Sequence, residues 1–588
     1  MTAAPWTPRV ARLGLAAVVL FAVLAGRLWS LQAIQGQYYL ELSEHNRIRD
    51  LKVPAPRGTI YDRRGQPLVS NRAAFTVSVL PMEVKDPLRL AEMLSPVLGL
   101  ARADIIARIE AGRRRPFEPV LLRRDVSQTV VATLEEHRLD LPGVLVQAEP
   151  VRAYLYGSLA AHALGYLGEI TEGELRSRPG YRMRDLIGKT GVERVYDDVL
   201  RGEPGRLQVE VDAAGRPIRV LGRLPARPGR SLVLNLDATL QAVAEAGLRD
   251  RSGAVVAMDP RSGEVLVLAS APSYDPNLFS GGISPANWKR LIGDRRLPLL
   301  NRAAEGTYEP GSVFKIVTGL SALSEGVARR DSTFACTGAL RLGRWVFRDL
   351  AAYGTVNFIR GVQVSCNVMF WLLGRAVGEA RLARYASAVG LGRPTGIDLP
   401  AEASGFIPTG EWKQRATREP WYPGDTLNMS IGQGYVLVTP LQVARMVSAV
   451  ATGDRLVRPR LVRRVLGPDG VEQQAFDPRD EPIPLAIPPE ALRALREGLL
   501  AVVEGGTGRA AAVPGLSVAG KTGSAENPRG IPHAWFAGYA PADRPSLVVV
   551  VFVEHGRRGG EAAAPIARAI FEAARPMLLT QAAGPGRP

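Results

Sequence analysis

Residues 515–524, GLSVAGKTGS, contain a lysine that fits two different kinds of active site. From Gly515 to Thr522 the stretch matches G-x-x-x-x-G-K-[ST], in which the backbone amides of a loop hold the phosphates of a nucleotide. Lys521, Thr522 and Gly523 also spell K-T-G, one of three short motifs that together mark a class of enzymes with a serine nucleophile. The surrounding sequence decides between these interpretations.

The sequence after Thr522 argues against a nucleotide site. A phosphate loop leads from a strand into a helix, whose N-terminal amides bind the phosphates. A strand before Gly520 is compatible with the pattern, but the following residues, GSAENPRGIPHAW, include two glycines and two prolines within 523–532. These residues exclude a helix at this place. We therefore interpret the phosphate-loop match as accidental.

Two further motifs of the serine class lie upstream, in the expected order. S-x-x-K appears as Ser312 and Lys315 within EPGSVFKIVTGLSAL, residues 309–323, which has the pattern of a helix. Side chains three positions apart on a helix share a face. A lysine removed from water can accept a proton from a serine, whereas an arginine cannot. S-x-N appears as Ser365 and Asn367. Each motif is weak alone, but the three in order within one domain indicate a serine active site.

The composition excludes several other function classes. Of 74 basic residues only seven are lysines, so arginine carries nearly all of the net charge of +17. The arginines are scattered, which favours a solvated basic surface over a nucleic-acid site. The five histidines and two cysteines form no C-x-x-C or H-x-x-x-H pattern, so we expect no metal and no other cofactor.

The N-terminus predicts a membrane anchor. Residues 13–31, LGLAAVVLFAVLAGRLWSL, are long and apolar enough to cross a bilayer as a helix. Arg9 and Arg12 precede them without a nearby acid, which predicts that the short tail is cytoplasmic and the remainder lies outside. A cleavable signal peptide is the alternative, because residues 23–25 resemble a cleavage site. We favour an anchor because the apolar run continues to Leu31.

An extracytoplasmic location bears on two open questions. No ATP pool exists outside the membrane, which further weakens the nucleotide interpretation. Cys336 and Cys366 can form a disulfide in such a compartment, but two free buried thiols are an equal alternative.

Strand patterns stand at both ends of the C-terminal region, with a mostly helical middle between them. Residues 253–270 predict a hairpin, and further strands are expected in 516–524, 533–541 and 546–556. Asp237 is a candidate cap for a helix over 238–248. We expect an α/β (α+β) domain in which one antiparallel sheet packs against a helical cluster.

The N-terminal region is different in character. The whole chain of 588 residues is too long for one core, and LPARPGR at 224–230 suggests a domain boundary. Residues 57–68 have a strand–turn–strand pattern, and 86–110 and 126–138 look helical. Nothing upstream of the boundary has the pattern of an active site.

With these motifs, residues 231–578 resemble the transpeptidase domain of penicillin-binding proteins. The region before it resembles their non-catalytic, dimerisation-type pedestal in RGTIYDRRGQPL, LGYLGEI and GVERVYDDVLRGEPG. It is similar to class B, because 35–230 lacks the acidic motif of the glycosyltransferase domain of class A. The resemblance divides the chain into a cytoplasmic tail (1–12), a transmembrane helix (13–34), the pedestal (35–230), the transpeptidase domain (231–578) and a flexible tail (579–588).

Two stretches indicate the subclass. Residues 421–444 and 533–541 are similar to the elongation enzymes, penicillin-binding protein 2, and the division-type enzymes usually differ at both. Ser524 departs from the threonine that many relatives carry after K-T-G, but it keeps a hydroxyl. Gly432–Gly434 is interpreted as a structural turn and left outside the site.

The resemblance implies a peptidoglycan D,D-transpeptidase. Ser312 would attack the penultimate D-alanine of a stem peptide and form an acyl-enzyme, with Lys315 as the base. Ser365 would relay a proton to the leaving amine. Asn367 would bind an amide of the donor peptide. An amine of a neighbouring stem peptide would then form the cross-link.

The third motif is expected to bind the substrate. Lys521 and Thr522 would bind its carboxylate, and Gly523 would let its backbone approach closely. The backbone N–H groups of Ser312 and Ser524 would form the oxyanion hole. β-Lactams should acylate Ser312 and leave slowly.

The resemblance also implies a setting and partners. The enzyme would be a single-pass protein of the bacterial inner membrane with a periplasmic catalytic domain. It would use nascent peptidoglycan made by a RodA-type glycosyltransferase of the SEDS family, and no nucleic acid. The alternatives are a division-type enzyme, a D,D-carboxypeptidase or β-lactamase that uses the same serine, and a β-lactam sensor.

Overall fold

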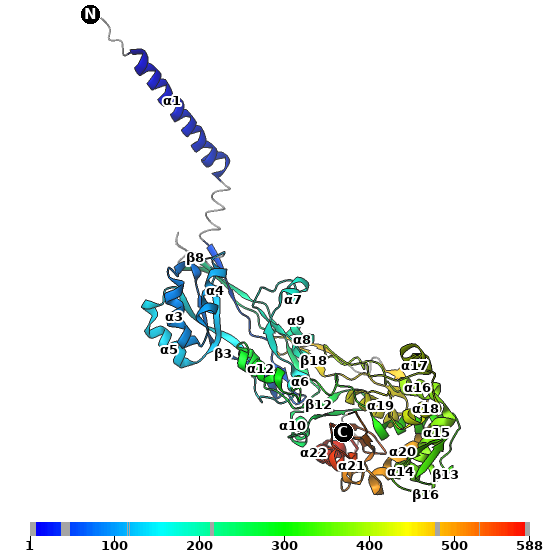
Figure 1. Cartoon of the computed structure of the whole chain (residues 1–588). Helices are drawn as coiled ribbons and strands as arrows, with labels where there is room; N and C mark the ends of the chain where they lie inside the picture. Colours follow the sequence, from blue (N-terminus) through cyan, green and yellow to red (C-terminus); the bar gives the residue numbers. More distant parts are fainter. Residues whose placement is uncertain are drawn as a thin grey trace, which may run out of the picture. The chain divides into compact units, whose positions relative to one another are not determined.

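The computed structural model describes residues 7–36, 48–114, 116, 118–211, 217–476, 482–528 and 530–582 (Figure 1). The chain forms two compact units, each built from several segments. The first comprises Met1–Pro56, Ala73–Pro150 and Gly202–Pro228, and the second Arg57–Arg72, Val151–Arg201 and Gly229–Pro588. Segments 57–72 and 151–201 thus belong with the C-terminal region, so the units interleave along the chain. The predicted boundary at 230/231 stays a prediction.

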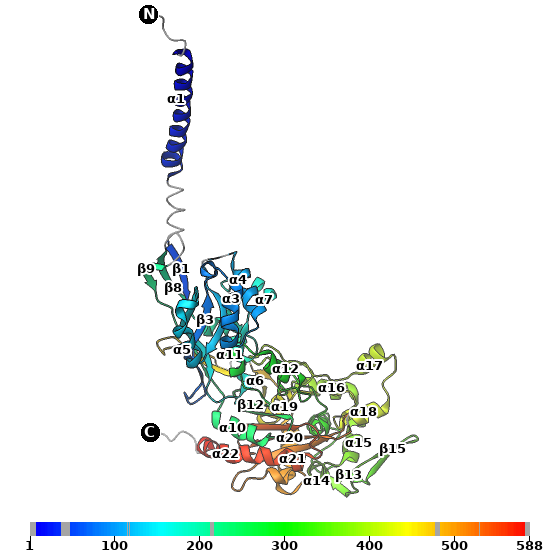
Figure 2. The same ribbon diagram turned by 60° about the vertical axis from the view of Figure 1, so that its left-hand side comes forward.

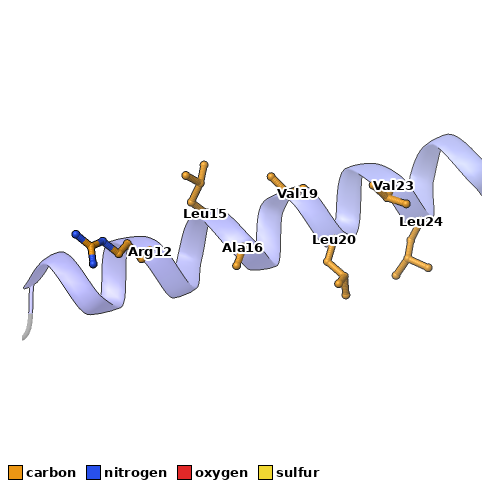
Figure 3. Close-up of a pocket in the computed structure, with 7 residues that line it drawn as sticks. All are labelled: Arg12, Leu15, Ala16, Val19, Leu20, Val23 and Leu24. Atoms are coloured by element: carbon orange, nitrogen blue, oxygen red, sulfur yellow. The ribbon is translucent and has the colours of Figure 1, made fainter.

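The N-terminal helix has the surface of a lipid-facing segment. Helix α1 (Thr7–Trp29) continues as the π-helix η1 (Ser30–Ile34). An 18-residue window within its span Val10–Ile34 has a mean hydropathy of 1.9, and none of that window is buried by other described residues. Figure 3 shows Arg12 near one end of the helix and six apolar side chains that project from it: Leu15, Ala16, Val19, Leu20, Val23 and Leu24. These side chains form an apolar surface along the helix.

In the first unit, helices pack on strand β4 (Val120–Val126) and on parts of strands β3 (Pro67–Val79) and β5 (Val144–Tyr154). Asp86 caps α3 (Pro87–Leu98) and Ser127 caps α5 (Gln128–Glu136). Gly99, in the left-handed conformation, ends α3, so the region 86–110 contains two helices and not one. The remaining elements are α4 (Arg102–Gly112), η2 (Pro81–Glu83), η3 (Arg138–Asp140), β1 (Ile48–Val53), β8 (Gly205–Val211) and β9 (Pro217–Leu224).

The second unit is built on a five-stranded antiparallel sheet. Its order is β12 (Val265–Ala271), β11 (Gly253–Met258), β23 (Leu547–Val553), β22 (His533–Ala540) and β21 (Ala519–Ala525). This confirms the expected fold class and places β21 at the edge. Strands β11, β22 and β23 are buried throughout, because both faces of the sheet are covered.

Alternate residues of these strands serve two cores. Val549 and Val551 of β23 pack with α10 (Ala238–Gly247) and α22 (Ala564–Ala582). Val550 and Phe552 face a larger core on the opposite side, which includes α19 (Pro440–Thr452) and α13 (Lys315–Ser324). Successive side chains along each strand point to opposite faces of the sheet, so apolar residues on both faces pack against helices. Asp237 caps α10, as predicted.

The predicted tail lies partly in a helix. Helix α22 continues to Ala582, so it includes the first residues of the predicted 579–588 tail; residues 583–588 lie outside the described chain, as do 1–6 of the predicted cytoplasmic tail and 37–47 of the predicted pedestal.

Helices and short hairpins fill the space between β12 and β21. Figures 1 and 2 both show α14 (Phe358–Val364) and α15 (Asn367–Val377) beside β13 (Thr333–Cys336). A disulfide between Cys336 and Cys366 joins β13 to the turn between these helices, which resolves the two alternatives left open by the sequence.

The other elements of the second unit follow. They are β2 (Ile60–Tyr61), α6 (Ala161–Leu164), β6 (Leu167–Glu169), α7 (Glu172–Ser177), β7 (Leu186–Gly188), α8 (Gly191–Val195), α9 (Asp197–Leu200), β10 (Ser231–Leu234), α11 (Asn277–Ser280), α12 (Pro285–Gly293), η4 (Gly311–Phe314), β14 (Ala339–Leu342), β15 (Trp345–Arg348), β16 (Gly354–Asn357), α16 (Glu379–Ala388), α17 (Gly410–Thr417), α18 (Pro423–Ser430), β17 (Arg455–Leu456), β18 (Val462–Leu466), β19 (Glu472–Ala475), β20 (Ile483–Pro484), α20 (Pro489–Gly505), η6 (Arg509–Ala511) and α21 (Gly559–Ala562).

Candidate active site

Ser312 lies in a tight turn at the start of a buried helix. It belongs to η4, and α13 begins three residues later at Lys315. The N–H of Gly311 donates to the carbonyl of Gly432 over 2.9 Å. A Cβ on Gly432 would lie 2.3 Å from the Gly311 carbonyl oxygen, so only glycine fits there. The G-Q-G turn is a structural turn, as predicted, and its Gly432 packs against the turn that carries Ser312.

The environment of Ser312 suits a nucleophile. Its side chain is half-buried, whereas its neighbours on both sides are buried. The turn stands at the N-terminal end of α13, where the helix dipole gives a positive potential that favours an oxyanion.

Lys315 is buried and held by the second motif. Its Nζ donates to the backbone oxygen of Ser365 (2.8 Å), to Ser365 Oγ (3.0 Å) and to Asn367 Oδ1 (2.5 Å). Burial lowers the pKa of Lys315 to about 7, although the charge of Asp349 opposes this shift. A large fraction of the amine is therefore neutral near pH 7 and can accept a proton.

Lys521 approaches the same serine from the opposite side. It lies on the edge strand β21, and its Nζ donates to Ser365 Oγ (2.9 Å) and to the carbonyl oxygen of Thr522 (3.1 Å). Burial, together with the charge of Lys315, lowers its pKa well below the ordinary value. The Ser365 hydroxyl thus lies between two buried amines that disfavour each other's protonation.

This position in β21 excludes the nucleotide interpretation. Gly520, Lys521 and Thr522 pair with β22 in mid-strand, and no helix begins after them. The lysine is fully engaged with Ser365 and its own strand.

The rest of the third motif packs closely against the serine turn. A Cβ on Gly523 would lie 2.9 Å from the carbonyl oxygen of Pro310 and 3.0 Å from Trp535 Cβ, so glycine is required for packing as well. Thr522 Oγ1 shares a 2.6 Å hydrogen bond with Thr507 Oγ1. The Ser524 side chain is exposed, and its Oγ accepts a 3.4 Å hydrogen bond from the Gly559 N–H.

The structure brings all eight predicted site residues into one region of the second unit. Three further residues at the site were not apparent from the sequence: Asp349, Gly432 in its supporting role, and Thr507. Asp349 and Thr507 belong to no motif, and their partners are distant in the sequence. Among the described residues, no group of three or more His, Cys, Asp or Glu side chains is arranged to hold a metal ion.

Known proteins share these features. Residues 253–572 match the model of the penicillin binding protein transpeptidase domain, and residues 52–234 match that of the penicillin-binding protein dimerisation domain. The peptidoglycan D,D-transpeptidase MrdA of Acinetobacter baumannii is 35% identical over 97% of this chain and 87% of its own length. The protein of the same name in Escherichia coli is 33% identical over 94% of this chain and 91% of its own.

Several solved structures have a fold similar to that of this chain. A complex between penicillin-binding protein 2 and MreC from Helicobacter pylori has a TM-score of 0.78 at 28% identity, covering 90% of this chain and 99% of that one. Penicillin-binding protein 2 of Pseudomonas aeruginosa, in complex with WCK 5153, has a TM-score of 0.68 at 30% identity, with 89% and 96% covered. A chain of a peptidoglycan synthase complex has a TM-score of 0.71 at 34% identity, with 96% and 98% covered.

Fold and site together define a serine enzyme with a transpeptidase domain on a dimerisation-type pedestal. The chain therefore belongs to the penicillin-binding proteins, and within them to the class B, penicillin-binding protein 2 type.

Proposed function

We propose that this chain is a membrane-anchored peptidoglycan D,D-transpeptidase of the elongation type, which works through an acyl-enzyme on Ser312. The observation that carries the proposal is the Ser365 hydroxyl between the buried amines of Lys315 and Lys521. The curated relatives named D,D-transpeptidase cover nearly the whole chain, which disfavours the hydrolase, sensor and division-type alternatives.

In the first step, Ser312 Oγ attacks the carbonyl carbon of the penultimate D-alanine. The hydroxyl proton passes to the neutral amine of Lys315, whose lowered pKa keeps it available near neutral pH. A C–O bond forms as the C–N bond to the terminal D-alanine breaks. The departing amine receives a proton through the Ser365 hydroxyl, which is hydrogen-bonded to both lysines.

The substrate is held by the edge strand and the second motif. The backbone N–H groups of Ser312 and Ser524 stabilise the developing oxyanion. Lys521 and Thr522 bind the terminal carboxylate, and Asn367 binds an amide of the donor peptide. A carboxylate near Lys521 favours its protonated form, which supplies the positive charge that burial otherwise suppresses.

In the second step, an amine of a neighbouring stem peptide replaces the serine. Its nitrogen attacks the ester carbonyl, a C–N bond forms as the C–O bond to Ser312 Oγ breaks, and the proton released by the amine returns to Ser312 Oγ through the same lysine–serine pair. The product is a cross-link between two glycan strands.

The anchor sets the location of this chemistry. Helix α1 supports a single-pass anchor in the bacterial inner membrane, with the N-terminus in the cytoplasm and the catalytic domain in the periplasm. We propose a RodA-type glycosyltransferase of the SEDS family as the source of nascent glycan. The similar structures of a complex with MreC and of a peptidoglycan synthase complex support an assembly of this kind.

Labelling with a fluorescent penicillin tests the site. The full-length protein in detergent should be labelled covalently, and Ser312→Ala should not. Equal labelling of both proteins would refute the assignment of Ser312.

Product analysis tests the reaction. With lipid-linked precursor and a glycan polymerase, cross-linked dimers should accumulate with one D-alanine released per cross-link. Release of D-alanine without dimers would identify a carboxypeptidase instead.

A further inference from the structure

One acidic side chain outside the three motifs contacts the second motif directly. Resting on the function proposed above, we propose that Asp349 is a positioning residue: it fixes the Ser365–Asn367 segment and supplies the negative charge that balances Lys315. None of the three motifs includes Asp349, and it contacts none of the reacting atoms.

Asp349 caps the helix that carries Asn367. Its Oδ2 accepts hydrogen bonds from the N–H groups of Asn367 (2.7 Å) and Val368 (3.3 Å), the first two residues of α15. The first N–H groups of a helix have no partner within the helix, and a carboxylate also stabilises the positive end of the helix dipole. The cap therefore fixes the position at which Asn367 meets Lys315.

Hydrogen bonds with backbone groups hold Asp349 in place. It follows β15, its N–H donates to the Gly338 carbonyl over 2.8 Å, and its Oδ1 accepts from the Leu350 N–H over 2.8 Å. The Tyr353 N–H donates to the Cys336 carbonyl over 2.8 Å. The loop between β13 and β16 is thus closed at its base, with Asp349 directed at α15.

The disulfide fixes the same segment from a second direction. Cys336 bonds to Cys366, the residue between Ser365 and Asn367, and both cysteines are fully buried. A covalent tether at 366 and a carboxylate at the following amide therefore converge on the S-C-N segment. Ser365 itself has a φ of +61°, a conformation that a serine keeps only when its surroundings hold it.

Asp349 also acts on Lys315 through its charge. The groups that face the Lys315 amine are Ser365 and Asn367, which accept its hydrogen bonds, the ring of Phe370 at 5.2 Å, and the second amine, Lys521. Asp349 is the carboxylate whose charge raises the pKa of Lys315 against the effect of burial. Removing that charge should lower this pKa further.

Asp349→Asn separates charge from shape, because the amide keeps an oxygen that can accept the cap hydrogen bonds. We expect the acidic limb of the pH profile of β-lactam acylation to move to lower pH by about half a unit or more. The plateau rate at high pH should fall, because a less basic amine is a weaker base. Asp86→Asn is the control, since the Asp86 carboxylate also accepts hydrogen bonds from two N–H groups at a helix start, that of α3, but belongs to the other unit and is distant from Lys315 in sequence.

Asp349→Ala removes both charge and cap. Acylation of the full-length protein should slow by about tenfold or more at every pH, given the usual cost of a lost helix cap. A double Cys336→Ser, Cys366→Ser variant should slow acylation without moving the midpoint of the acidic limb.

An unchanged rate and pH profile in Asp349→Asn would overturn the proposal. So would a slower Asp349→Ala whose acidic limb keeps the wild-type midpoint, since that result indicates a purely structural cap. Failure of the proposed function itself is distinguishable, because Ser312→Ala would then still be labelled.

Discussion

Two regions of the second unit bury a lysine in different ways, and the comparison shows why one of them is suited to accept a proton. Lys315 and Lys413 are 1% and 2% exposed. Lys413, on α17, forms an ion pair of 2.6 Å with Asp425 on α18 and lies over the ring of Tyr422. Lys315 instead meets a hydroxyl, a carbonyl and an amide oxygen, with a second lysine nearby.

The carboxylate of Asp425, which bonds directly to Lys413, explains why the pKa values of the two lysines shift in opposite directions. Burial lowers the pKa of both lysines, but the hydrogen bond and charge of Asp425 outweigh this effect, and the pKa of Lys413 is raised. The stability linked to Lys413 is therefore fully present below the ordinary pKa of lysine and is lost as the pH rises through its raised pKa. Lys315 has a lowered pKa, so the stability linked to it increases as the pH rises from about 7 towards the unfolded value. Lys413 thus stabilises the fold. The environment of Lys315 lowers its pKa, which favours proton acceptance but reduces stability.

The largest expected effect comes from removing the reactive amine. Lys315→Met should slow β-lactam acylation about 10²- to 10⁴-fold, the usual contribution of a general base. Lys413→Met should change the rate by less than about twofold, because Lys413 contacts none of the motif residues. Stopped-flow acylation measures both. Equal losses in the two variants would remove the distinction between the regions.

The two substitutions should lower the free energy of unfolding in the reverse order, with Lys413→Met the more destabilising. Lys413→Met leaves Asp425 largely buried without its cation and should cost about 2–4 kcal/mol. Lys315→Met removes a poorly solvated amine but leaves the Ser365 carbonyl oxygen and Asn367 Oδ1 without their donor, so it should cost less than Lys413→Met, about 0–2 kcal/mol. Thermal unfolding of the two variants at pH 7 compares them. A more severe loss of stability in Lys315→Met would contradict the assigned roles.

The turn that carries Ser312 offers a sharper test within the reactive region. In Gly432→Ala, the new methyl group would meet the Gly311 carbonyl at 2.3 Å, which should cost about 1–3 kcal/mol and slow acylation roughly tenfold. Gly470→Ala is the matched control, because Gly470 also has a positive φ but no atom within 4 Å of a Cβ. Similar acylation rates in the two variants would show that contact with the serine turn is unimportant.

The smallest effect is expected at a neutral hydrogen bond of the site. Thr507→Val removes the partner of Thr522 Oγ1 and should cost about 1 kcal/mol, less than the charged pair at Lys413. A loss as large as that of Lys413→Met, measured by thermal unfolding, would mean that this pair contributes more than a neutral hydrogen bond.

The sequence predicted those parts of the site in which residue type determines chemistry. A lysine three residues after a serine, in a chain with only seven lysines, identified Lys315 before its environment was visible. The hairpin at 253–270 and the Asp237 cap were equally accessible, because each depends on local patterns.

Long-range contacts were not predictable in this way. Asp349 is one acid in an irregular stretch, and its partners are backbone amides that carry no sequence signature. The interleaving of the units involves contacts such as Arg64 with Asp237 and Tyr196 with Asp398, whose members lie more than a hundred residues apart. No local pattern joins such residues.

The pH dependence of β-lactam acylation tests the central claim most directly. If Lys315 is the buried base of Ser312, the acylation rate constant of the wild-type protein should rise with pH and reach half of its plateau near a pH of about 7. The midpoint should be the same in Lys413→Met. A rate that is constant between about pH 5 and pH 9, or that rises only near the ordinary pKa of lysine, would contradict the account.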